Sequence, residues 1–317
     1  MEAFSLDFEK PLQELQEKIA KTQAFSKENG VDMSAQIAEL EKELKKQKTE
    51  LFENLTPWQR VTLARHPKRP YALDYIDRIA TDFMELKGDR RYGNDEAIIG
   101  GFAKIDGEPV MILAHQKGRD LKERNKRNFG MAHPEGYRKA LRLMKLADKA
   151  KAPIICIIDT PGAYPGVASE ERHIGEAIAV NLKEMFNLSV PVICVVIGEG
   201  GSGGALGIGI GNSVMIMENA YYSVISPEGC AGIIWKDGSR GPEAAEAMKI
   251  TSNDLLKLGV VDKVIKEPIG GAHIDYDVTA QSFKEAILSE LSELSKLSDE
   301  ELKNQRYERF RKLGETA

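Results

Sequence analysis

The sequence predicts an α/β fold, and two observations point to it. From Tyr71 onward, short apolar runs rich in valine and isoleucine alternate with glycine-bearing loops and with helical stretches. Two of these runs, within 152–158 and 190–196, have nearly the same sequence, and each leads into a glycine loop and then a helix. This suggests a repeated strand–loop–helix unit, although two buried strands could also resemble each other because both need β-branched residues.

The N-terminal segment is predicted to be a helical hairpin. Leucine and isoleucine recur at helical spacing within Leu12–Ile19 and again within Ile37–Leu55, and Asn29-Gly30 between them is typical of a helix end. Two such narrow apolar seams bury little surface by themselves, so we expect the hairpin to pack on another subunit. The sequence therefore divides into an assembly arm over 1–55 and one domain over 56–317.

The remaining elements follow from the apolar runs in chain order. The predicted strands are Val110–Ala114, Ile154–Ile158, Val192–Ile197, Val214–Met217 and Tyr222–Ile225. A helix is predicted over Pro134–Lys149, where apolar residues occupy one face, and another over Pro242–Ile250. From Thr279 to Ala317 the chain is charged and helical in pattern, which predicts a helical C-terminal tail.

Composition excludes several classes of protein. The net charge of −5 argues against bulk affinity for nucleic acid. The three cysteines, Cys156, Cys194 and Cys230, include no CxxC pair, so neither a zinc ribbon nor a disulfide framework is expected. Without a signal sequence or an apolar stretch of membrane-spanning length, the chain is expected to be cytoplasmic.

The segment Gly198–Gly211 is the most informative one. It follows a predicted strand and contains 8 of the 28 glycines. Such density lets the backbone approach a ligand closely, and a helix that begins within Ala205–Ile210 would present its first N–H groups there. The segment therefore predicts an anion or oxyanion site built from the main chain. Tight packing of a helix on a sheet also selects glycine and remains an alternative.

The segment departs from one known loop motif, fits a second without specificity and matches a third. No lysine follows the glycines, which excludes a Walker A loop, and a dinucleotide fingerprint can be fitted to any run so rich in glycine. The pattern Gly-x-Ser-x-Gly is met with Ser202 at its centre, and His273 lies downstream, in the order found in α/β-hydrolases. A serine hydrolase that uses Ser202 is therefore a second hypothesis.

Other loops also follow predicted strands. Asp159–Gly166 holds two prolines and two glycines, and Ser223–Cys230 follows a later strand. Because ligand sites of α/β proteins gather where strands end, these loops predict a cleft. The run Lys117–Arg127 has six basic and two acidic residues, so it would attract a carboxylate or phosphate group.

Four long segments together resemble one known family, the alpha subunit of bacterial acetyl-CoA carboxylase carboxyltransferase. The resemblance extends from Leu6 through Tyr307, and family members commonly carry histidine where this chain has Lys87. The segments that carry it are Asn128–Met144, Asp159–Gly166, Gly198–Ala205 and Tyr222–Gly229.

The resemblance implies a crotonase (ClpP)-like fold of repeated ββα units with an N-terminal helical hairpin and a helical tail. It implies transfer of a carboxyl group from carboxybiotin, held by the biotin carboxyl carrier protein, to acetyl-CoA. The product would be malonyl-CoA, the first committed intermediate of fatty acid synthesis. The enzyme would be active only with a beta subunit, as an alpha2beta2 complex.

The same resemblance implies where the cofactors belong. Zinc is expected only in the beta subunit, ATP is expected to be used by the biotin carboxylase component, and this chain should carry no covalently bound cofactor and no metal. Neither nucleic acid nor a membrane is an expected partner.

The site residues expected from the resemblance and from the loops are of two kinds. Some are loop residues whose main chain could contact a ligand, and the others are positively charged. Gly203 and Gly204 match the family's alpha-side oxyanion pair and would stabilise the charge that grows on the ureido oxygen of biotin. The candidate substrate- and biotin-binding residues are Gly162, Ala163, Tyr164, Gly200, Gly201, Ser202, Ala205, Arg119, Arg124 and Arg127.

An enoyl-CoA hydratase or isomerase of the same fold is a third hypothesis. Such an enzyme needs carboxylates over the thioester, for which the candidates are Glu170, Glu171, Glu199 and Glu228.

Overall fold

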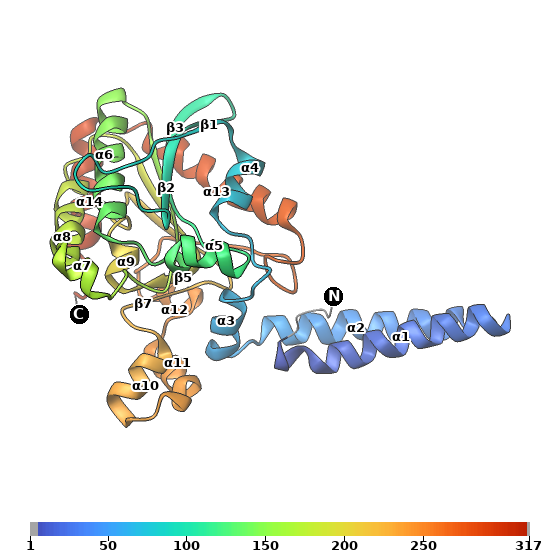
Figure 1. Cartoon of the computed structure of the whole chain (residues 1–317). Coiled ribbons are helices and arrows are strands. Elements are labelled where there is room, and N and C mark those ends of the chain that lie inside the picture. Colours follow the sequence, from blue (N-terminus) through green and yellow to red (C-terminus); the bar gives the residue numbers. More distant parts are fainter. Residues whose placement is uncertain (1–5, 316–317) are drawn as a thin grey trace.

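The computed structural model describes residues 6–315, and a mixed β-sheet forms the centre of the molecule (Figure 1). Its strand order is β1-β2-β3-β4-β5-β6-β8, and β7 pairs with the end of β5. The strands are β1 (Thr81–Glu85), β2 (Ile98–Ile105), β3 (Glu108–His115), β4 (Ile154–Thr160), β5 (Val192–Gly201), β6 (Ser213–Met217), β7 (Tyr221–Ser223) and β8 (Lys263–Ile265).

The two similar segments of the sequence are neighbours in this sheet. β4 and β5 run parallel, with Ile154 opposite Val192 and Cys156 opposite Cys194. Every residue of both strands is buried, as expected for parallel strands that are covered on both faces. β1, β2 and β3 are joined in antiparallel pairs. The predicted α/β fold is therefore confirmed.

The structure corrects three predicted boundaries around the glycine segment. β5 continues to Gly201, beyond its predicted end at Ile197, because its last three residues pair with β7. β7 ends at Ser223, two residues before its predicted end. The helix α9 (Ser202–Leu206) begins at Ser202 and not within Ala205–Ile210. The glycine segment is therefore strand in its first part and helix in its second.

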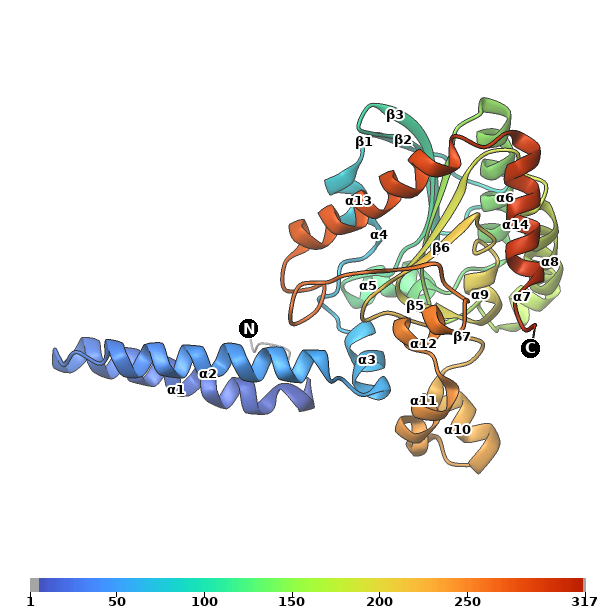
Figure 2. The same ribbon diagram turned by 180° about the vertical axis from the view of Figure 1, so that it is seen from behind.

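Helices cover both faces of the sheet. Figures 1 and 2 show α6 and α8 on one face and α4 and α13 on the other, and α6 matches the helix predicted over Pro134–Lys149. Besides α9, the helices of the body are α3 (Pro57–Ala64), α4 (Ala72–Ile79), α5 (Leu121–Lys126), α6 (Pro134–Ala150), α7 (Val167–Glu171), α8 (Ile174–Met185), α10 (Pro227–Trp235), α11 (Gly241–Met248), α12 (Ser252–Lys257), α13 (Tyr276–Leu294) and α14 (Asp299–Arg311). Short 3-10 helices lie at Asp7–Glu9, Asn128–Gly130 and Gly238–Arg240.

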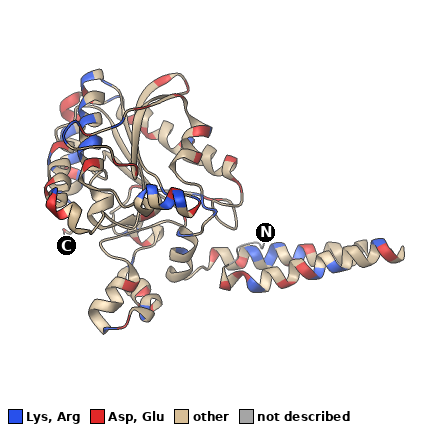
Figure 3. Cartoon of the chain, in the orientation of Figure 1, with Lys and Arg blue, Asp and Glu red and all other residues tan. Residues whose placement is uncertain are grey.

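The N-terminal hairpin is present as predicted. α1 (Lys10–Asn29) ends at Gly30, whose φ of 67° is left-handed, and α2 (Ser34–Glu53) returns beside it. The hairpin projects from the body in Figures 1 and 2, and Lys and Arg alternate with Asp and Glu along it in Figure 3. At its base, Leu6 and Leu55 pack with Leu63 of α3. No helix within residues 6–315 is long and apolar enough to cross a membrane.

Candidate functional site

The two predicted glycine loops lie against each other at the carboxyl ends of β4 and β5. A Cβ atom at Gly201 would stand 2.1 Å from the carbonyl oxygen of Pro161. One at Gly204 would stand 2.4 Å from the carbonyl carbon of Gly162 and 2.5 Å from the nitrogen of Ala163. Glycine is required at both positions because any side chain would force the two backbones apart.

A sharp turn joins β5 directly to α9 at this place. Ser202, the first residue of α9, has a left-handed φ of 51°, a conformation that residues other than glycine adopt rarely and often at functional sites. Gly203 and Gly204 are the next two residues of the helix. Because the first N–H groups of a helix have no partner within it, those of Gly203 and Gly204 are not satisfied by α9 itself.

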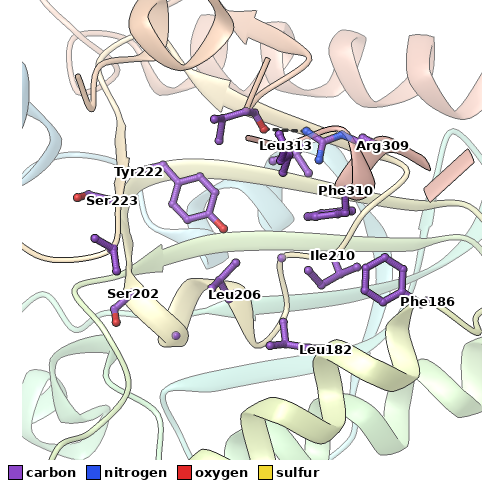
Figure 4. A pocket seen from close by; sticks show the side chains of 15 residues that line it. Leu182, Phe186, Ser202, Leu206, Ile210, Tyr222, Ser223, Arg309, Phe310 and Leu313 are labelled. Atoms are coloured by element: carbon purple, nitrogen blue, oxygen red, sulfur yellow. Dashed lines mark hydrogen bonds between the residues drawn. The ribbon is translucent and has the colours of Figure 1, made fainter. Parts of the chain in front are cut away.

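A cavity of about 520 Å³ lies beside α9, between α8 and α14 (Figure 4). Ser202 and Gly203 lie at its edge, and a Cβ atom at Gly203 would meet nothing closer than Ile178 Cδ1 at 3.5 Å. The apolar side chains around it include Leu182, Phe186, Leu206, Ile210, Phe310 and Leu313. Open space for an apolar ligand therefore adjoins the exposed backbone of the turn.

A buried charge network occupies the other side of the end of β5. Glu199 accepts hydrogen bonds from Lys117 Nζ at 2.7 Å, from Arg65 Nε at 2.8 Å and from Tyr221 Oη at 2.7 Å. Lys117 also donates to Asp159 at 2.7 Å. Burial would raise the pKa of Glu199, but the charges of Lys117 and Arg65 lower it to about 2, so this carboxylate stays ionised.

Two of the four carboxylates that a hydratase would use, Glu199 and Glu228, are kept ionised by a neighbouring arginine. Arg65 joins Glu199 to Glu228, and the pKa of Glu228 is held below its usual range by that guanidinium against the effect of burial. Glu170 and Glu171 are exposed on α7. The sequence carries no local signal for the role of Arg65, because Arg65 and Glu199 are 134 residues apart.

The three arginines expected at the site differ in their surroundings. Arg124 lines a smaller cavity of about 220 Å³ together with Lys117 and Pro161. Arg119 instead pairs with Asp74, and Arg127 donates to Glu123 and to a backbone carbonyl. α5, which lies in this basic run, is visible in Figure 3 as a cluster of blue residues. Arg124 is therefore the arginine of the three that faces a cavity.

The other predicted site residues make hydrogen-bond and packing contacts around the turn. Tyr164 donates its backbone N–H to Ala132 at 3.0 Å, and its ring lies 4.4 Å from that of His133. A Cβ atom at Gly200 would stand 2.8 Å from the ring of Tyr222. Ala205 is fully buried. For Gly200 and Ala205, tight packing accounts for the small residue.

The structure does not bring the residues of a serine hydrolase together. Ser202 lines the large cavity, whereas His273 stacks on His66 with 3.8 Å between ring centroids and lies close to Leu63 of α3, at the base of the hairpin. Within residues 6–315, no group of three or more His, Cys, Asp or Glu side chains is arranged to hold a metal ion.

Comparison with known proteins places the chain in one family over almost its full length. The family model described as acetyl co-enzyme A carboxylase carboxyltransferase-like matches residues 5–314. The acetyl-coenzyme A carboxylase carboxyl transferase subunit alpha of Geobacillus sp. (strain WCH70) is 57% identical over 312 residues, covering 98% of this chain and 96% of the relative. The subunit alpha of Bacillus subtilis (strain 168) is 56% identical with the same coverage.

Solved structures share the fold. Transcarboxylase 12S, crystallised with methylmalonyl-coenzyme A and methylmalonic acid, matches with a TM-score of 0.59 and 22% identity, over 72% of this chain and 42% of that chain. The Pseudomonas malonate decarboxylase hetero-dimer matches with a TM-score of 0.56 and 17% identity, over 70% and 90%. These likenesses confirm the crotonase-like fold. From the matches to the family model and to its relatives, the chain belongs to the family of acetyl-CoA carboxylase carboxyltransferase alpha subunits.

Proposed function

We propose that this chain transfers a carboxyl group from carboxybiotin, carried by the biotin carboxyl carrier protein, to acetyl-CoA, and so forms malonyl-CoA for fatty acid synthesis. Family membership supports the reaction, because the relatives are carboxyl transferases of acetyl-CoA carboxylase. The observation that carries the site is the turn into α9, where Ser202 and Gly203 border a ligand-sized cavity and Gly204 follows them in the helix.

In this proposal, main-chain N–H groups of this chain stabilise the charge that develops during the reaction. As the carboxyl group leaves biotin, negative charge develops on the ureido oxygen, and the N–H groups of Gly203 and Gly204 stabilise it without reorganisation. Losing one such donor typically costs about 2.7–4 kcal/mol of barrier. The freed biotin nitrogen accepts the proton of the acetyl group, so no side-chain base is needed. Loops of the beta subunit hold the thioester enolate.

The loop beside the turn contributes to binding. Gly162 and Ala163 lie against Gly204, so they form one wall of the place where biotin enters. Arg124 attracts an anionic group of the substrate through the smaller cavity. Arg119 and Arg127 act with it by fixing the basic segment through Asp74 and Glu123.

The chain works as part of a larger assembly. We infer an alpha2beta2 complex in the cytoplasm, with zinc in the beta subunit and with ATP used by the biotin carboxylase component. The segment 1–55 serves as the assembly arm, because α1 and α2 within it project from the body and expose Phe25 and Val31 near the tip. A partner that covers these side chains removes apolar surface from water.

The test is a carboxyl transfer assay with purified subunits. The chain, a beta subunit and biocytin are mixed with malonyl-CoA, and the reverse reaction is followed as acetyl-CoA formation that depends on biocytin. We expect activity from the mixture and none from either subunit alone. Full activity of this chain alone would contradict a shared site, and an intact complex without transfer would contradict the proposed reaction.

A further inference from the structure

The helix α9 is not stable without contacts to neighbouring elements. It has five residues, two of them glycine, and glycine flanks it at both ends. A helix so short is unstable in isolation, and glycine weakens it further because its backbone has many other conformations. Neighbouring elements must therefore fix the orientation of its peptide groups.

Two buried side chains donate hydrogen bonds to a carbonyl of α9 and to that of Gly207, the residue that follows it. Tyr137 of α6 donates its hydroxyl to the carbonyl of Gly204 at 3.3 Å. Asn181 of α8 donates its amide to the carbonyl of Gly207 at 2.9 Å and to that of Tyr137 at 3.0 Å. The ring of Tyr137 also packs on Gly207, where a Cβ atom would stand 2.5 Å from two ring carbons. α6, α8 and α9 are thus joined into one hydrogen-bonded unit.

This arrangement carries a cost in stability. Tyr137 and Asn181 are fully buried. The Oδ1 atom of Asn181 has no hydrogen-bond partner among the described residues. Unpaired buried polar atoms destabilise a protein, so the unused acceptor of Asn181 is a cost at this place. The polar groups are therefore better explained by what they position.

We propose that Tyr137 and Asn181 are positioning residues for carboxyl transfer. They fix the Gly204–Ala205 and Gly207–Ile208 peptide groups. In this way they hold α9 in place, and with it the N–H groups of Gly203 and Gly204 that face the substrate oxygen in the proposed reaction. The inference rests on the proposed function, because it assigns the two side chains a task in that reaction. Without the two anchors, the glycine-rich turn samples orientations in which the donors miss their target.

The test compares two variants with a matched control. Tyr137→Phe removes one hydroxyl and keeps the ring on Gly207, and Asn181→Leu removes the amide donor at similar volume. The control is Tyr75→Phe, because Tyr75 is equally buried on α4, packs on Phe283 and has an unpartnered hydroxyl. Each variant is assayed with the beta subunit for kcat, KM and thermal midpoint, and for amide hydrogen exchange in a peptide spanning 198–211.

We expect Tyr137→Phe to lower kcat about 10-fold at unchanged KM for malonyl-CoA, with faster exchange in the 198–211 peptide and little change in thermal midpoint. Asn181→Leu should act in the same direction, and Tyr75→Phe should change neither kcat nor the exchange. Unchanged exchange in Tyr137→Phe would overturn the proposal, and so would faster exchange with unchanged kcat. If the wild-type complex transfers no carboxyl group, the proposed function fails, while the exchange comparison still decides whether these side chains hold α9.

Discussion

The change Gly204→Ala tests directly whether the contact between the two loops matters for activity. The added Cβ would lie 2.4 Å from the Gly162 carbonyl carbon, whereas ordinary contacts begin near 3.4 Å. The loops must therefore separate by about 1 Å at this point, and a misplacement of that size costs about 100-fold in rate. At about 1.36 kcal/mol per factor of ten, the barrier to carboxyl transfer rises by about 2.7 kcal/mol.

The assay for this change is carboxyl transfer between malonyl-CoA and biocytin in the presence of the beta subunit. The matched control is Gly175→Ala, in the first turn of α8, where an added Cβ has nothing within 4 Å. We expect the control to keep its kcat within about twofold, because alanine suits a helix better than glycine. Wild-type kcat in an intact Gly204→Ala complex would refute the reasoning, as would an equal loss in the control.

Four further changes test other parts of the structure. Ser202→Ala should lower kcat by less than about threefold, whereas a loss comparable to that of a catalytic nucleophile, about 10⁶-fold, would support the hydrolase hypothesis. The ionised form of Glu199 should contribute about 3 kcal/mol of stability above pH 4.5, lost as the pH falls towards its folded-state pKa of about 2. The free energy of unfolding, measured with denaturant from pH 6 to 2, should therefore depend less on pH in Glu199→Gln than in the wild type. An identical pH dependence in the two proteins would contradict this. Arg306→Met should destabilise the fold by about 3 kcal/mol or more, because it leaves three buried backbone carbonyls without their donor; a thermal midpoint like that of the wild type would argue against it. Deleting residues 1–54 should prevent assembly with the beta subunit, while the far-ultraviolet circular dichroism of the body stays unchanged. A truncated chain that still assembles would contradict the role of this segment as an assembly arm.

Parts of the fold with a strong local pattern could be predicted, and parts without one could not. The apolar runs of β4 and β5 and the one-sided pattern of α6 identify those elements closely. β1 has no alternating pattern, since four of its five residues are exposed. β2 contains Gly101 because a Cβ there would stand 2.1 Å from a carbonyl of β1. Such strands are stabilised by their neighbours, and their own composition does not indicate them.

By itself, the sequence determined the family, the hairpin, the buried strands and the glycine loops that end them, because these depend on residues close together in the chain. Only the tertiary structure decided how the loops meet and what supports them. Gly204 lies against Gly162 across two strands, and the Tyr137 that holds it is 67 residues away. The charge network likewise depends on Arg65, which no loop motif includes. Packing and hydrogen bonds between distant segments leave no periodicity in the sequence, so these contacts appear only when the chain is folded.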